Sequence, residues 1–520
     1  MLDKFLHRKR NIFRVQIADW LLVVVALAVF TAISIWNITG ASIWFDEAFG
    51  AYLSQFNFID IARYTASDVH PPMYYWLLKL WAMLFGNTDL AMRSMSVLFG
   101  GVAIVFGYLL TNRLFSRNIA RVSLILMAVS PMLIRYSREM RMYTLVTAIA
   151  MAATYILVIA MESKKKLPWV IYGILVALGM WTHYFTALIW IAHWIWRADI
   201  IRRIAGKGKF IKQFFSKQWL MSHIIAVAVF VPWLPFMAIQ FATVQASGFW
   251  IAPITPDTVI NFMTNVVFYQ DIGEVNNWLA IGFIVLIVAV SIMAVIVYKK
   301  QNQQQRQNYR LVMALAFIPV VILTVLSLPP LRPAFVDRYL IPSTLSIVLF
   351  MAVTIGFAMK SFRPRLRILF VLPVISMFVI GITNVWYLGN YNKTDGSTTS
   401  THQFVQDISE KYSGQPIIAS TPWLFYEASF YSTDKTPVYF IDAKIEYRYG
   451  SLKMLQENDQ FKIKDMDKFV ANNPVFWYVG VTRTGDFAIP YANWEKITEL
   501  NYTDPINGKS SYKAIQFKSN

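Results

Sequence analysis

Residues 19–38 read DWLLVVVALAVFTAISIWNI, an almost uninterrupted apolar run that is long enough to cross a lipid bilayer as one helix. Runs of similar length recur as far as Leu388. Of all 520 residues, 57% are hydrophobic and 15% are charged, and the mean hydropathy is +0.46. Soluble domains contain about 45–50% apolar and about 25% charged residues. The composition therefore predicts a polytopic α-helical membrane protein, whose first apolar run is too long for a cleavable signal peptide.

The net charge of +19 is concentrated in short loops. Of the 48 lysines and arginines, 26 fall in six segments, at 1–14, 113–121, 164–166, 197–217, 299–310 and 360–367. Cytoplasmic loops of membrane proteins carry such an excess of Lys and Arg. The basic charge therefore indicates how the chain is threaded through the membrane, and we predict no nucleic-acid partner.

About eleven transmembrane helices are predicted when the six basic segments are placed in the cytoplasm. The apolar stretches lie near 19–38, 88–112, 119–135, 142–161, 168–182, 184–200, 218–240, 277–298, 311–328, 339–359 and 368–388. A single crossing at 167–196 would put the later basic segments outside, so we predict two short helices that turn near Thr182 and His183. The chain is then a multi-pass plasma-membrane protein with a cytoplasmic N-terminus and an external C-terminus.

Two domains are expected, a transmembrane domain over 1–388 and a soluble extracytoplasmic domain over 389–520. The second carries 14 Lys and Arg against 15 Asp and Glu, unlike the basic membrane part. Apolar segments at 416–419, 437–441 and 474–480, with a helical stretch at 422–431, predict a small α/β unit. Its isolated titratable groups, Glu427 and His402, are predicted to be solvated surface residues.

The first external loop, at about 39–87, contains two groups of candidate site residues. Apolar residues recur with helical spacing from Phe45 to Phe56, which predicts an amphipathic helix at the lipid boundary. Asp46 and Glu47 lie at its start, where they could act in catalysis or simply interact favourably with the helix dipole. Further along, His70 precedes two prolines and an apolar helix that reaches Phe85. Its single charge, Lys79, could bind an anion or extend to the membrane interface.

A second external turn contains three guanidiniums in seven residues, Arg135, Arg138 and Arg141. Arginine is costly at membrane depth, and its planar fork matches phosphate oxygens. The cluster therefore suggests a bound phosphate, although a pair with Glu139 is the alternative. Arg338, at the start of a later helix, could also bind an anion or pair with Asp337.

Carboxylates and cations are thus predicted on the same face of the membrane, as group transfer from a lipid-linked donor would require. No cofactor is required by these residues, and the chain has no cysteine. A divalent metal ion held by Asp46, Glu47 and His70 is an alternative. Another is a lipid-linked-sugar flippase or transporter, in which the same arginines move a headgroup without forming a bond.

Six motifs carry a resemblance to a known family. They are WFDE at 44–47, HPPMYY at 70–75, LFG at 84–86, SP at 130–131, YSREMRMY at 136–143 and RYL at 338–340. In this order they resemble the bacterial branch of the protein mannosyltransferase-like family, within the GT-C superfamily of membrane glycosyltransferases. The similarity covers roughly residues 18–390. It implies a GT-C-like fold with juxtamembrane helices in the first external loop.

The resemblance also implies a reaction, the transfer of a sugar from a polyprenyl-phosphate carrier to a cell-envelope protein, lipid or glycan at the outer face. It makes Asp46 the general base and Glu47 its partner. The residues expected to bind the carrier phosphate or lie beside it are Arg141, Arg138, Arg338, Lys79, His70, Tyr74 and Tyr143. Arg138 stands where the family motif often has Gln, so Arg141 is favoured as the phosphate-binding arginine.

Overall fold

The computed structural model describes residues 17–204, 208–247, 250–269, 277–361, 364–387, 400–441, 451–481, 489, 494–503 and 510–519. The basic segment at 1–14 lies outside these residues. The chain forms two compact units. The first comprises the chain up to Trp36, Val69–Tyr74 and Arg93–Tyr387, and the second comprises Asn37–Asp68, Tyr75–Met92 and the chain from Leu388. The first external loop therefore contributes residues to both units.

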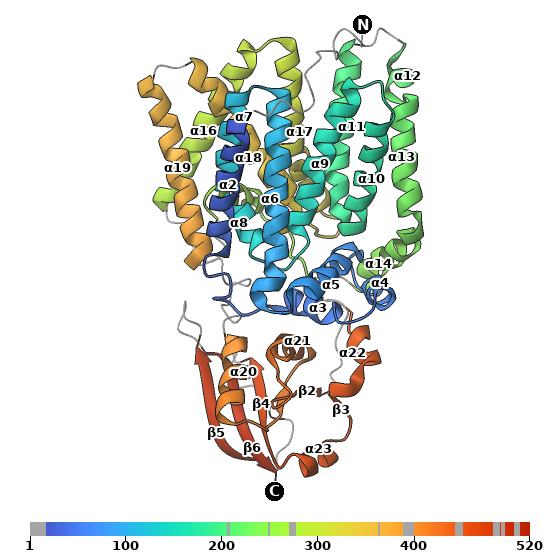
Figure 1. Cartoon of the computed structure of the whole chain (residues 1–520), viewed down its shortest axis with the longest axis vertical. Helices are drawn as coiled ribbons and strands as arrows, with labels where there is room; N and C mark the ends of the chain where they lie inside the picture. Colours follow the sequence, from blue (N-terminus) through green and yellow to red (C-terminus); the bar gives the residue numbers. More distant parts are fainter. Residues whose placement is uncertain are drawn as a thin grey trace. The chain divides into compact units, whose positions relative to one another are not determined.

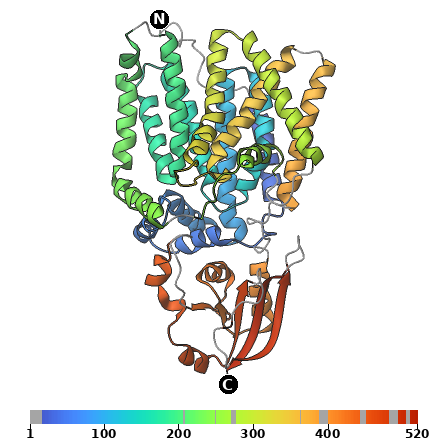
Figure 2. The same ribbon diagram turned by 180° about the vertical axis from the view of Figure 1, so that it is seen from behind.

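The first unit is a bundle of long helices (Figure 1, and from behind in Figure 2). Helix α6 (Asp89–Leu114) starts in the second unit and continues into this bundle. The other helical elements are α2 (Ile17–Ile35), α7 (Arg117–Ala128), α8 (Pro131–Ser137), α9 (Tyr143–Glu162), α10 (Leu167–Thr182), η1 (Tyr184–Thr186), α11 (Ala187–Ile204), α12 (Phe210–Phe214), α13 (Lys217–Phe230), η2 (Val231–Trp233), α14 (Leu234–Ser247), α15 (Pro256–Phe268), α16 (Asn277–Lys300), α17 (Gln303–Leu326), η3 (Asp337–Leu340), α18 (Ile341–Ser361) and α19 (Pro364–Tyr387).

The predicted polytopic helical architecture is confirmed. Within the described residues, seven helices are long and apolar enough to cross a membrane, or eight if the bent pair of α7 and α8 is one span. The two helices bend by 52° at a break before Pro131, which cannot donate a backbone hydrogen bond. The segment at 167–196 forms two helices, α10 and α11, that turn at His183 as predicted. Helix α10 is apolar but shorter than the seven spans.

Helices α9 and α18 lie at the centre of this bundle, with 94% and 100% of their apolar windows buried. In the span formed by α13 and α14 the buried share is only 22%, as expected for a helix that faces lipid. Helices α10 and α13 approach closely at Gly173. A Cβ atom there would lie 2.3 Å from the carbonyl oxygen of Ser222, so a larger residue would force these helices apart.

The second unit contains a six-stranded sheet in the order β3-β2-β1-β4-β6-β5. The strands are β1 (Ile417–Ala419), β2 (Val438–Ile441), β3 (Lys462–Ile463), β4 (Val475–Val481), β5 (Trp494–Thr503) and β6 (Ser510–Ser519). The first four are parallel, whereas β6 pairs antiparallel with β4 and β5. The three predicted strands and the helix between them are confirmed. Strand β3 and the β5–β6 pair were not predicted.

Helices cover both faces of this sheet. The helical elements of the unit are α3 (Phe45–Leu53), α4 (Phe58–Ala66), α5 (Met73–Phe85), which begins in the first unit, α20 (Ser400–Lys411), α21 (Pro422–Tyr431), α22 (Lys453–Glu457), η6 (Asp459–Phe461) and α23 (Met466–Asn472). On one face, Met466 and Val470 of α23 pack against Phe476 and Phe517. Because successive strand residues alternate between faces, Tyr512, which contacts Phe404 of α20, lies on the other.

Helix α3 is the predicted amphipathic helix, but it packs on protein. Most of its apolar residues are buried within the second unit. The half-buried Phe45 contacts Trp423 edge to face at 4.6 Å between ring centroids. The ring of Tyr52 lies 5.3 Å from that of Tyr426. These partners belong to α21, so the expectation that this face rests on lipid is corrected. Aromatic pairs of this geometry contribute about 0.5–1.5 kcal/mol each beyond burial, which favours α21 as the partner.

Hydrogen bonds fix the ends of the first-loop segment to the C-terminal domain. The Tyr431 hydroxyl donates to Asp89 Oδ2 at 2.8 Å and accepts the backbone N–H of Ile43 at 2.8 Å. At the other side, Asn458 Nδ2 donates to the Tyr64 hydroxyl at 2.7 Å. The domain therefore holds the segment that carries Asp46 from both sides.

Replacement of Tyr431 by phenylalanine is expected to lower the free energy of unfolding by about 1–3 kcal/mol, because the buried Ile43 N–H loses its acceptor. Thermal unfolding of the purified protein measures this change. Tyr439→Phe is the matched control, since no hydrogen bond of the Tyr439 hydroxyl is recorded among the described residues. Equal losses in the two variants would show that the Tyr431 hydroxyl does not stabilise the unit.

The prediction that Glu427 is a solvated residue is wrong. Its side chain is buried, and Oε2 accepts hydrogen bonds from Thr401 Oγ1 at 3.2 Å and from the Tyr512 hydroxyl at 3.3 Å. The carboxylate thus links helices α20 and α21 to strand β6. His402 is exposed as predicted and stacks on Tyr431 at 4.4 Å between ring centroids.

Candidate active site

The arginine-rich turn at 135–141 connects α8 to α9, and its arginines have different partners. Arg135, in α8, pairs with Glu139 at 3.3 Å and donates through Nε to the Tyr269 hydroxyl at 3.0 Å. Both charged groups are buried. A buried pair of this kind holds the turn in shape and neutralises the charge of Arg135. The alternative of an Arg–Glu pair in this cluster is therefore confirmed for Arg135.

Arg138 also has a structural role. Its Nη1 donates to the carbonyl oxygens of Ser34, at 2.9 Å, and of Trp36. These carbonyls lie at the C-terminal end of α2, where the last turn of a helix lacks intrahelical partners. Arg138 is thus a cap for α2. The choice of Arg141 over Arg138 as the phosphate-binding arginine stays a prediction.

Arg141 lies beside a cluster of basic and aromatic side chains from three other segments. Arg141 is buried in the turn, and its carbonyl accepts a hydrogen bond from Ser96 Oγ of α6 at 3.2 Å. The guanidinium of Arg338 lies over the rings of Tyr143, at 6.0 Å, and Trp250, at 4.9 Å. The resulting concentration of positive charge at the N-terminal end of α9 suits an anion.

His183 also belongs to this cluster, although the sequence predicts only a turn at this position. Its ring lies 4.9 Å from that of Tyr339 and 6.2 Å from that of Tyr143. Nδ1 accepts the backbone N–H of Phe185 at 3.3 Å, so a neutral ring carries its proton on Nε2 and can donate it. Burial, followed by the nearby His70, Arg141 and Arg338, holds the pKa of His183 well below its usual value. The sequence signal for this residue was a lone histidine at the turn between two predicted helices.

The predicted residues His70 and Tyr74 belong to the same unit, because the segment Val69–Tyr74 joins the helix bundle. The rings of His70 and His183 lie 5.5 Å apart, and Tyr74 is buried. Thr182 Oγ1 donates to the sulfur of Met73 at 3.6 Å. The structure thus brings His70, Arg141, Arg338 and His183 into one neighbourhood, as the sequence suggested for the first three.

Asp46 and Glu47 belong to the second unit, in the first turn of α3. Asp46 is half-buried, whereas Glu47 is fully buried and accepts the backbone N–H of Trp44 at 3.3 Å. This hydrogen bond is half of a capping box, in which the third residue of a helix satisfies the N–H of the residue before it. Glu47 therefore stabilises the start of α3, and its role as a catalytic partner stays a prediction.

Lys79 also belongs to the second unit. Its Nζ donates to the carbonyl oxygen of Ser54, at the end of α3, at 3.3 Å, and lies 5.9 Å from the ring centroid of Phe58. Lys79 therefore connects α5 to α3. Its contact with the carrier phosphate stays a prediction.

The metal alternative gains no support from side-chain positions. In the part of the chain that the structure describes, no three histidine or acidic side chains are grouped so that they could hold a metal ion. Asp46, Glu47 and His70 are among these described residues. We therefore assign no metal ligands.

Comparisons with known proteins agree with this architecture. Residues 69–236 match the family model of dolichyl-phosphate-mannose-protein mannosyltransferases. The crystal structure of ArnT from Cupriavidus metallidurans in the apo state is similar, with a TM-score of 0.61 and 12% identity over 96% of this chain and 98% of that chain. For the same protein bound to undecaprenyl phosphate, the TM-score is 0.59 and the identity 10%, over 96% and 98%. No curated protein matches this chain significantly.

The chain has the fold of ArnT over nearly its whole length, with helices long and apolar enough to cross a membrane. The fold that the motifs predict is confirmed, and the family match over residues 69–236 supports the predicted class of enzyme, a glycosyltransferase. Over residues 69–236, about a third of the chain, the sequence is similar to the dolichyl-phosphate-mannose-protein mannosyltransferase family.

Proposed function

We propose that this glycosyltransferase moves a sugar from a polyprenyl-phosphate carrier to a hydroxyl acceptor of the cell envelope, on the extracytoplasmic face. The observation that carries the proposal is the cluster of Arg141, Arg338 and His183 in the helical unit. The undecaprenyl phosphate bound to the ArnT structure supports the same class of carrier.

The charges in the cluster suit a departing phosphate. When the sugar–phosphate bond breaks, the electron pair of the bond stays on a phosphate oxygen, and the carrier leaves as a monophosphate. Guanidinium forks bind phosphate oxygens with two parallel hydrogen bonds, and a buried site strengthens each of them. We assign this role to Arg141 and Arg338. The Nε2–H of neutral His183 is suited to donate a further hydrogen bond to the phosphate.

The acceptor oxygen must lose a proton as it bonds to the anomeric carbon. We assign this proton to the Asp46 carboxylate, because a positioned carboxylate can act as a general base and the family resemblance marks this residue. The proposal requires that Asp46, from the second unit, and the arginines, from the first, reach the same substrate.

A direct assay tests the proposal. Purified protein is mixed with a set of polyprenyl-phosphate sugars and a delipidated cell-envelope fraction, and mass spectrometry follows both carrier and acceptor. We expect free polyprenyl phosphate and a glycosylated acceptor in equal amounts. Transfer of intact carrier across reconstituted vesicles, with no sugar transferred to any acceptor, would instead identify a flippase.

A further inference from the structure

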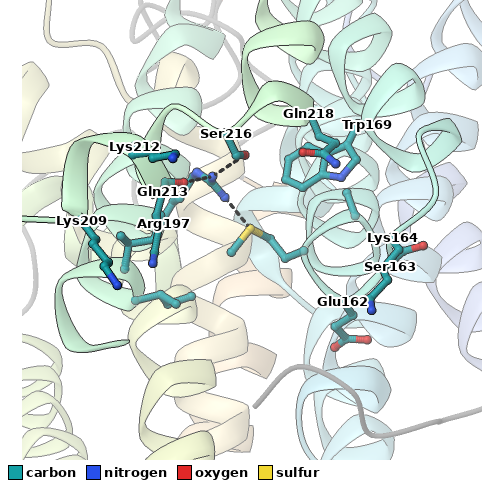
Figure 3. A pocket seen from close by; sticks show the side chains of 14 residues that line it. Glu162, Ser163, Lys164, Trp169, Arg197, Lys209, Lys212, Gln213, Ser216 and Gln218 are labelled. Atoms are coloured by element: carbon teal, nitrogen blue, oxygen red, sulfur yellow. Dashed lines mark hydrogen bonds between the residues drawn. The ribbon is translucent and has the colours of Figure 1, made fainter. Parts of the chain in front are cut away.

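A second basic site lies at the opposite ends of the helices that carry the candidate active site. A cavity of about 900 Å³ opens between the end of α9, the start of α10, the end of α11 and α12, and the start of α13 (Figure 3). This volume is in the range of small-molecule sites. The lysines and arginines of these helix ends belong to the segments at 164–166 and 197–217 that the sequence places in the cytoplasm.

Arg197 lines this cavity, and its side chain is buried. Its guanidinium donates to the carbonyl oxygens of Gln213 and Phe214, at 3.0 Å each, and to Ser216 Oγ at 3.0 Å. The two carbonyls belong to the last turn of α12, which has no intrahelical donors for them. Arg197 also lies over the ring of Trp219 at 4.5 Å. These contacts fix α12 against α11, so the cavity has a definite shape.

The rim of the cavity is positively charged. Lys209 and Lys212 are exposed, and in Figure 3 they lie across the cavity from Ser163 and Lys164. The acidic residue that lines the cavity, Glu162, is neutralised by Arg113, whose Nε lies 3.0 Å from the Glu162 carboxylate. The lining therefore keeps an excess of positive charge, which favours an anionic ligand.

The surroundings of the cavity favour a lipid over a soluble anion. Ile211 and Phe215, next to the basic rim, are 71% and 44% exposed, and Leu167 at the start of α10 is 65% exposed. Apolar side chains beside lysines are typical of a segment at the membrane interface. A ligand with a phosphate head and acyl chains can contact both kinds of side chain at once, whereas a free phosphate contacts only the first.

From these observations we infer that the cavity is a binding site for the headgroup of an anionic phospholipid of the cytoplasmic leaflet. The phosphodiester is bound between Lys209, Lys212 and Lys164, and the acyl chains leave past Ile211 and Phe215. Basic pockets between transmembrane helices on the cytoplasmic side bind anionic headgroups in this way. The site is separate from the proposed carrier site, at the other ends of α9, α10 and α11.

The double variant Lys209→Ala/Lys212→Ala tests the inference. Native mass spectrometry of the detergent-purified full-length protein measures how much phosphatidylglycerol stays bound during a titration. We expect the apparent affinity for phosphatidylglycerol to fall about tenfold. Phosphatidylethanolamine, which carries no net charge, is expected to bind more weakly to the wild type. Because both lysines are exposed, the variant is expected to keep the unfolding temperature of the wild type.

The matched control is Lys299→Ala/Lys300→Ala, which removes the same charge from exposed lysines at the end of α16. Equal losses of phosphatidylglycerol in the two double variants would overturn the inference, because general attraction would then explain the binding. Displacement of the lipid by an equimolar amount of free glycerol phosphate would also overturn it, since the cavity would then be a site for a soluble phosphate. Each outcome is independent of sugar transfer.

Discussion

Arg141→Ala is expected to lower the turnover of sugar transfer by about 10²–10³, with little change in protein abundance. The reason is the charge of the leaving group. A phosphate that departs into a buried site is stabilised by cations that are already in place, and each such donor typically contributes a factor of this size. Steady-state release of polyprenyl phosphate by the purified variant measures the effect, and size-exclusion chromatography reports whether the fold is intact.

Variants of two other arginines serve as controls, because they distinguish a loss of catalysis from a loss of stability. Arg332→Ala is the matched control, because Arg332 is an exposed arginine of the loop that precedes Arg338. We expect it to leave turnover near the wild-type value. Arg138→Ala should instead lower stability, because the carbonyls of Ser34 and Trp36 lose their donor. Normal turnover and unchanged carrier affinity in Arg141→Ala would exclude Arg141 from the site.

Much of the fold could be predicted because membrane insertion imposes a simple pattern. Each span must be apolar over about 20 residues, and Lys and Arg gather on the cytoplasmic side, so run length and charge indicate the spans. Even the short pair α10 and α11 follows from this rule. The partner of α3 could not be predicted in this way. Its apolar face is equally compatible with lipid and with protein, and the choice depends on α21, nearly 370 residues further along the chain.

The roles of the candidate site residues were harder to predict, because they also depend on contacts between distant parts of the chain. Three arginines in seven residues look alike in the sequence, yet Arg135 pairs with Glu139 and Arg138 caps α2. These partners give Arg135 and Arg138 structural roles that the sequence does not reveal. Glu427 shows the same limit, since its burial depends on Thr401 and Tyr512, which lie far from it in the chain. Motifs identify which residues are unusual, whereas long-range contacts decide what each of them does.

The arrangement of the first loop suggests how the residues for proton transfer and for phosphate departure are each held in place. Helix α3 is held by α21 and by the hydrogen bonds of Tyr431, while Val69–Tyr74 belongs to the helix bundle. Residues on rigid elements keep their geometry better than residues on free loops. We therefore expect the C-terminal domain to support catalysis by ordering the segment that carries Asp46, without contributing a reacting group itself.

Asp46→Asn is expected to abolish most of the sugar transfer, with a loss of about 10²–10⁴ in turnover. Asparagine has nearly the same shape and keeps the contacts of α3, but it cannot accept a proton from the acceptor hydroxyl. Carrier affinity should therefore stay close to that of the wild type while turnover falls. Binding of polyprenyl phosphate and release of polyprenyl phosphate from the sugar-loaded donor measure the two quantities separately.

Asp60→Asn is the matched control for this variant, because Asp60 is a carboxylate in the first turn of the neighbouring helix α4. It removes the same charge from the same unit, so a general electrostatic effect would appear in both variants. We expect full turnover in Asp60→Asn. If Asp46→Asn transferred sugar at the wild-type rate, another group would have to take the proton. The general base would then have to be sought among the residues around Arg141, with His70 as the first candidate because it has a ring nitrogen.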